Sequence, residues 1–132
     1  IFVEQYFYKI NIEGETAADI ASTMILPAAN RYLSELLQCA ERADDVGLKV
    51  RGVLKTAAEV AELIDELTDA LYHLNEQNAE LGGEEIAEKA EHMRANIIPA
   101  MERVRSAADR LEKLVADDLW PMPTYRDMLF VK

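Results

Sequence analysis

The sequence predicts an all-α fold, an antiparallel up-down-up bundle of three long helices. The first observation is composition, because the 132 residues include only five Gly and four Pro and are rich in the helix formers Ala, Leu and Glu. The second is an apolar periodicity of threes and fours along three long segments. The third is the shortness of the breaks between them, which makes consecutive helices antiparallel neighbours. A chain of this length forms a single domain, residues 1–132, around one core.

Residues 1–14 form a lead-in segment whose secondary structure the pattern leaves open. A helical stripe is present at Val3, Tyr6, Phe7 and Ile10, and a strand-like alternation at Tyr6, Tyr8, Ile10 and Ile12. We favour the helix, and in either form the aromatic side chains need cover. Because the chain starts at Ile1 without an initiator Met or a polar lead-in, we expect it to be cut from a longer protein.

Helix one is predicted over residues 15–45. Thr16 is a good N-cap, with Asp19 three residues later, and Asp44, Asp45 and Gly47 mark the end. Pro27 lies inside the pattern, lacks an N–H and should kink a continuous helix. The predicted inner face comprises Ala17, Ile20, Ala21, Met24, Ala28, Leu33, Leu36, Ala40 and Ala43.

Helix two is predicted over residues 50–82 and has the cleanest periodicity. Its apolar residues follow a heptad seam, an alternation of fours and threes typical of coiled coils. The seam comprises Val53, Ala57, Val60, Ile64, Leu67, Leu71 and Leu74, and Asn78 and Leu81 continue the register. Gly82 and Gly83 should end the helix, because glycine readily adopts the left-handed conformation of a C-terminal cap.

Helix three is predicted over residues 84–118, followed by a tail at 119–132. Its inner face comprises Ile86, Ala90, Met93, Ile97, Met101, Val104, Ala108, Leu111 and Val115. The segment around Pro99 echoes the segment around Pro27, so we expect two kinks at matched heights, bending both helices around one core. The tail carries Trp120 and Tyr125 and is too apolar for a solvated end, so we expect it to pack on the bundle.

The charge and the single cysteine exclude several classes of function. A net charge of −11 disfavours nucleic acid as a partner, because an acidic surface repels phosphates. No apolar run approaches the ~20 residues of a membrane span, and no signal peptide is recognisable. Cys39 fits a reducing cytoplasm and is predicted to be a small buried hydrophobe.

No catalytic constellation or metal site is predicted. The di-metal centres of helical bundles need Glu-x-x-His pairs, which are absent from the sequence, and neither His73 nor His92 has a second histidine near it. The acidic pairs Glu84-Glu85 and Asp117-Asp118 are interpreted as solvated helix ends. The sequence also lacks a glycine-rich phosphate loop and a nucleophile motif.

Helix three carries basic residues that could bind an anion. They are Arg94, Arg103, Arg105 and Arg110. Acidic residues lie three or four positions away from them, so we favour ion pairs over an anion site. The expected partners are Glu102, Asp109, Glu112 and Asp117.

Two segments resemble the C-terminal region of type III glutamine synthetases. The first is Tyr6–Tyr32, with Ile10-Asn11-Ile12-Glu13, Thr16 and Ile25-Leu26-Pro27-Ala28. The second contains Ile98-Pro99-Ala100-Met101, Arg105, Asp109, Leu111-Glu112, Trp120-Pro121-x-Pro123-Thr124-Tyr125 and Leu129-Phe130. Together they bracket nearly the whole chain, and the Trp-Pro-x-Pro-Thr-Tyr ending is the most specific part.

The resemblance implies a C-terminal helical domain of a ligase that joins ammonia to glutamate with ATP and magnesium. The family's nucleotide, glutamate and metal sites lie upstream, so no catalytic, cofactor-binding or metal residue is transferred to this chain, which alone should be inactive. The implied partners are its own catalytic domain and neighbouring subunits of a homo-oligomer. The alternative is a free-standing coiled-coil-like module that binds a partner helix along the seam of helix two.

Overall fold

The computed structural model describes residues 14–80 and 85–121, and all of the regular secondary structure in these ranges is helical. The first helical run covers residues 14–45 and the second and third cover 51–79 and 86–112. Its elements are a first helix at 14–20, η1 (Ala21–Ile25), α2 (Leu26–Asp45), α3 (Arg51–Ala79), α4 (Ile86–His92), η2 (Met93–Ile97) and α5 (Ile98–Glu112). The prediction of an all-helical chain with three long helices is therefore confirmed.

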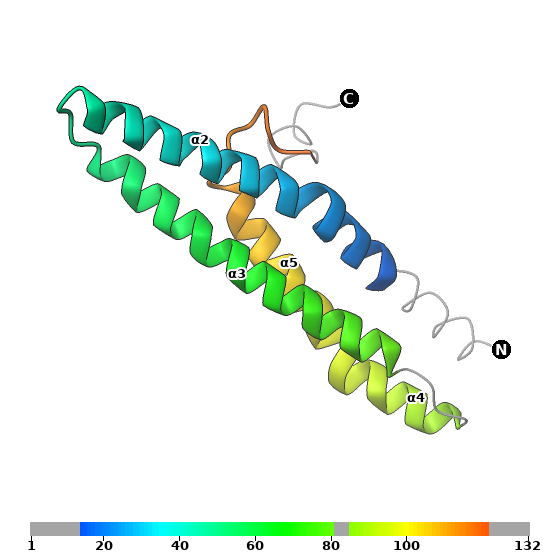
Figure 1. Cartoon of the computed structure of the whole chain (residues 1–132). Helices are drawn as coiled ribbons and strands as arrows, with labels where there is room; N and C mark the ends of the chain where they lie inside the picture. Colours follow the sequence, from blue (N-terminus) through cyan, green and yellow to red (C-terminus); the bar gives the residue numbers. More distant parts are fainter. Residues whose placement is uncertain (1–13, 81–84, 122–132) are drawn as a thin grey trace.

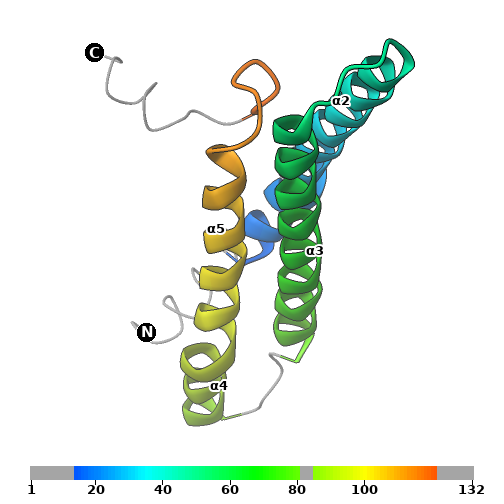
Figure 2. The same cartoon turned by 90° about the vertical axis from the view of Figure 1, so that its left-hand side faces the viewer.

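Helix α3 is the centre of the arrangement. It packs against α2 on one side and α5 on the other, whereas α2 and α5 scarcely touch (Figures 1 and 2). The chain reverses after α2 at a turn where Gly47 has a φ of +79°, a conformation that glycine adopts without steric cost. Figure 1 shows α3 leaving this turn and running back along α2.

The core lies where α3 meets both neighbours. Most of the predicted seam of α3 is buried, including Val60, Leu67 and Leu74, each with no exposed surface. Leu63 and Ala70 are also buried, because a helix between two neighbours needs a wider apolar face than a two-helix seam. Met93, Ile97 and Leu111 complete the core from the third helical run.

Both internal prolines follow a π-helical turn. The Leu26 N–H donates to the Ala21 carbonyl, and the Ile98 N–H donates to the Met93 carbonyl, each spanning five residues. Proline has no N–H with which to donate a hydrogen bond. The same wider turn precedes Pro27 and Pro99. The helical backbone continues through both sites, and π-turns are sites where helices bend. The predicted kinks themselves stay predictions.

The π-turns also rotate the buried face, which corrects one predicted core residue. In the first run the buried apolar residues are Ala18, Ala21, Ile25, Ala28 and Ala29. Met24, predicted to face inward, is instead exposed. The wider turn explains this, because the predicted stripe assumed a regular α-helix throughout.

Three further predictions from the sequence are wrong. Thr16 is not an N-cap, because the chain is already helical at residue 14. Cys39 is exposed rather than buried, in a part of α2 where no residue is buried. The third helix ends at Glu112, before the predicted residue 118, since Asp117 and Asp118 favour turns over helix.

Some predictions fall outside the described residues. They are the choice between helix and strand for residues 1–12, the cap at Gly82 and Gly83, and the position of Tyr125. At the described end of the tail, Leu119 and Trp120 are half-buried and pack against the core. No helix in 14–80 or 85–121 is both long enough and apolar enough to cross a membrane.

Candidate functional site

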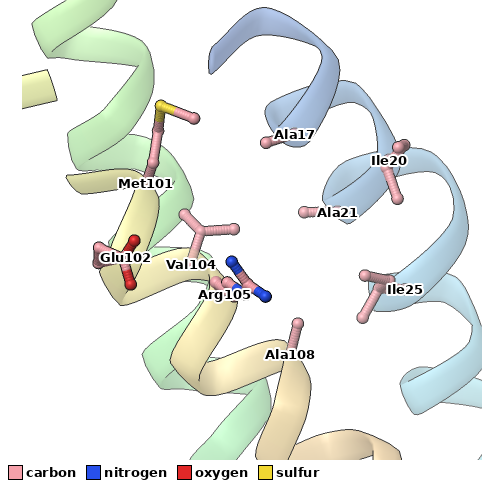
Figure 3. A pocket seen from close by; sticks show the side chains of 9 residues that line it. All are labelled: Ala17, Ile20, Ala21, Ile25, Met101, Glu102, Val104, Arg105 and Ala108. Atoms are coloured by element: carbon pink, nitrogen blue, oxygen red, sulfur yellow. The ribbon is translucent and has the colours of Figure 1, made fainter. Parts of the chain in front are cut away.

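An apolar groove runs between the first helical run and α5 (Figure 3). Its volume is about 270 Å³. Its lining comprises Ala17, Ile20, Ala21, Ile25, Met101, Glu102, Val104, Arg105 and Ala108. Such a concave, mostly apolar surface with a few polar groups at its edge is the usual form of a binding site.

The groove is lined by side chains that the sequence assigned to the core. Ala17, Ile20, Met101 and Ala108 all belong to the predicted inner faces, yet each is only half-buried. On α5 the buried residues of this part are Ala100, Val104 and Ala107, and Val104 also lines the groove. The predicted stripe therefore extends beyond the buried residues, and Met101 and Ala108 lie at the groove.

The polar edge of the groove consists of Glu102 and Arg105 on α5. Both side chains are exposed. Figure 3 shows the Arg105 guanidinium reaching from α5 toward the first helical run. The lining contains no histidine, cysteine or hydroxyl side chain. The groove offers apolar contact and one charge of each sign.

Two of the four arginines in the third helical run form ion pairs. Arg94 pairs with Glu91 at 2.6 Å, and Arg110 pairs with Glu66 on α3. The structure thus favours the ion-pair interpretation over an anion site for these two residues, although their partners are not the predicted ones. Both pairs are at least half exposed, so each contributes at most about 1 kcal/mol.

His92 joins α4 to the end of α3. Its Nε2 lies 2.9 Å from the Gln77 carbonyl oxygen, and its Nδ1 lies 3.1 Å from Nδ2 of Asn96. A carbonyl only accepts and an amide nitrogen only donates, so this geometry assigns the proton to Nε2. Nearby, the buried Oδ1 of Asn78 has no hydrogen-bond partner. The contacts of His92 are those of a structural histidine.

The other candidate chemical groups are dispersed. Within 14–80 and 85–121, the structure brings no three His, Cys, Asp or Glu side chains close enough to hold a metal ion. Glu85 is exposed at the start of α4, and Asp117 and Asp118 are exposed in the turns after α5. Sequence reasoning missed Arg105 as a lining residue and Asn96 as a partner of His92. The similarity between the segments around Pro27 and Pro99 was the signal in the sequence that the set of inward-facing residues would change there.

Comparison with known proteins points to one family. The glutamine synthetase C-terminal domain matches residues 1–44. A glutamine synthetase of Bacteroides fragilis is 26% identical over 98% of this chain, and a type-3 glutamine synthetase of Dictyostelium discoideum is 27% identical over 100% of it.

The similarity is restricted to one part of those relatives. The chain spans 19% of the length of each, and that part is their C-terminal region. This agrees with the resemblance carried by the two sequence segments around Pro27 and Pro99. The chain is therefore similar to the C-terminal region of glutamine synthetases, one of them a type-3 member.

Proposed function

We propose that the chain is a non-catalytic helical domain of a type III glutamine synthetase, serving the architecture, assembly or modulation of that enzyme. The observation that carries the proposal is the similarity along nearly the whole chain to only 19% of its relatives. The parent chain would ligate ammonia to glutamate with ATP and magnesium bound upstream of this domain.

The architecture proposed for this role is an antiparallel up-down-up bundle, kinked at Pro27 and Pro99. The contact of α3 with both α2 and α5 supports the arrangement, and the paired π-turns support the kinks. The proposed domain limits are residues 1–132, with the tail docked on the bundle. The half-buried Trp120, packed against the core, supports that docking.

The partners that we propose are the parent's own catalytic domain and neighbouring subunits of a homo-oligomer in the cytoplasm. Part of the domain is shaped for such contacts. The α2–α3 arm, residues 30–56, contains no buried residue and extends past the end of α5 (Figures 1 and 2). It exposes Leu37, Val46, Leu48 and Leu54. The net charge of −11 argues against nucleic acid as the partner.

A direct test compares the chain by itself with the parent enzyme. We expect the chain alone to form no glutamine from glutamate, ammonia and ATP. In the parent, replacing Leu48 and Leu54 by Ser should leave the catalytic groups intact but weaken subunit association, measured by light scattering. The matched control is Thr56→Ser, also on the arm. Glutamine formation by the chain alone would overturn the non-catalytic role, and unchanged assembly would overturn the role of the arm.

The alternative is a free-standing coiled-coil-like module that binds a partner helix. The seam of α3 on which this alternative was based is mostly buried, so the partner helix would bind along the arm. The same exposed leucines favour it, because an apolar stripe on a helical pair accepts another helix. The coding sequence separates the two proposals. If no ligase catalytic domain precedes Ile1, the interaction module is the better account.

A further inference from the structure

We propose that the apolar groove between the first helical run and α5 is the docking site of the chain's own C-terminal segment, residues 122–132. The segment would cover Ile20, Met101 and Ala108 and complete the core on the side that α3 does not reach. This inference is independent of the enzyme family and of the arm.

The groove needs an apolar cover. Ile20 and Met101 are half-buried across it from each other (Figure 3). Both pack against the buried core but keep part of their surface exposed. Covering a large aliphatic side chain is worth about 1.5–3 kcal/mol, so a segment able to fill the groove gains free energy by binding there.

The chain position favours the C-terminal segment as the occupant. After Glu112 the chain makes turns, and Leu119 and Trp120 pack back onto the core, so the described chain stays on the bundle up to Pro121. Residues Met101–Ala108 precede the end of α5 by about 6–17 Å of helix, at 1.5 Å per residue. The eleven residues after Pro121 reach about 16 Å as a helix and about 36 Å when extended. Either conformation spans the groove.

The chemistry of the segment matches that of the groove. Its apolar side chains are Met122, Tyr125, Met128, Leu129, Phe130 and Val131. A volume of about 270 Å³ admits an aromatic ring together with aliphatic neighbours, since a cavity of roughly 150 Å³ already holds benzene. The segment also carries Arg126 and Asp127, which are complementary in sign to Glu102 and Arg105 at the groove's edge.

The N-terminal segment is a poorer occupant. Residues 1–13 lead directly into one wall of the groove, so they would have to reverse direction at its end to lie inside it. The chain is already helical at Gly14, and Gly14 is buried. An added Cβ there would lie 3.1 Å from Oδ1 of Asn78. Gly14 therefore packs closely against the end of α3.

Thiol accessibility tests the proposal in the intact protein. Ala108→Cys places a small probe in the groove, and the exposed native Cys39 is the internal reference, with alkylation at each site read by peptide mass spectrometry. We expect the groove thiol to react at least about tenfold more slowly than Cys39. With Leu129→Ser and Phe130→Ser in the tail, the groove rate should rise at least about fivefold while the Cys39 rate stays unchanged.

Equal groove rates with and without the tail substitutions would overturn the proposal. Protection that depends on protein concentration but not on the tail would assign the groove to a second copy of the chain. Circular dichroism checks that the substituted protein remains helical.

A benzophenone side chain placed at Phe130 provides a second test in a protein with an otherwise unaltered tail. Photocrosslinks to residues 17–25 or 101–108 of the same molecule support the proposal. Crosslinks to the α2–α3 arm or to another molecule alone would contradict it.

Discussion

Two parts of the α2–α3 pair differ in how completely they are buried. They are the α2–α3 arm, residues 30–56, and the body, where α5 also packs against α3. In the body, α3 is covered by both neighbours, and Val60, Leu67 and Leu74 are fully buried. In the arm, α3 has only α2 beside it, and Val53 on the same seam is half-buried. The apolar periodicity is continuous through both parts. The heptad pattern therefore specifies which face of α3 turns inward, whereas the third helix decides how completely that face is buried.

The largest expected effect is the difference between equivalent substitutions in the two parts. Leu67→Ala in the body should lower the free energy of unfolding by about 3–4 kcal/mol, because it leaves a cavity in a closed core. Leu54→Ala in the arm should change it by no more than about 0.5 kcal/mol, since Leu54 is 53% exposed. Urea denaturation of the two variants measures the difference. Similar losses would mean that the arm is as well packed as the body.

The described end of the tail should behave as part of the body. Trp120→Ala is expected to destabilise the protein by about 2 kcal/mol, less than for a fully buried tryptophan, because Trp120 is half-buried against the core. Thermal unfolding by circular dichroism gives the value, with Trp120→Phe as the matched control that retains an aromatic ring. An unchanged unfolding temperature would show that Trp120 serves a partner rather than the bundle.

The contact between α4 and α3 at the opposite end of the body should be weaker. His92→Ala removes the hydrogen bonds to Gln77 and Asn96 and should lower the free energy of unfolding by about 1–2 kcal/mol. His92→Asn, whose side-chain amide reaches less far, is the conservative comparison. Amide hydrogen exchange in α4 should accelerate in both variants. If only global stability changes, His92 does not specifically hold α4.

The smallest effect is expected for the ion pair between α3 and α5. Glu66→Gln breaks the contact with Arg110 and should cost no more than about 1 kcal/mol, because both side chains are about half exposed. The loss should shrink as salt is added, since ions screen exposed charges. Chemical denaturation at low and high ionic strength measures it. A larger loss that is independent of salt would contradict a surface pair.

The fold class, the three helices and most of the α3 seam could be predicted because apolar spacing reports the buried face directly. The exposure of Met24 and the groove at Met101 could not, because Met24 lies within one π-turn and Met101 follows the other, and apolar spacing does not reveal such turns. Cys39 was misjudged for another reason. Its neighbours in sequence are apolar, but a side chain in this part of α2 is buried only if a third helix also covers it. Helix α5 ends before it reaches this part of α2 (Figures 1 and 2).

For the candidate site, the sequence supplied the residues but not their role. Ala17, Ile20 and Ala108 were recognised as inward-facing, and the structure shows that they line an open groove. The family resemblance came from local motifs around both prolines and the tail, which remain readable without the fold. The expectation that the catalytic residues lie upstream of this chain rests on that resemblance and not on packing.

The body forms a core of its own, and we propose that the arm is a surface completed by the parent assembly. Amide hydrogen exchange of the chain alone and of the assembled parent enzyme tests it most directly. We predict strong protection of residues 60–74 in both samples, and protection of residues 33–56 that rises at least about tenfold on assembly. Equal protection of residues 33–56 in the two samples would contradict the account.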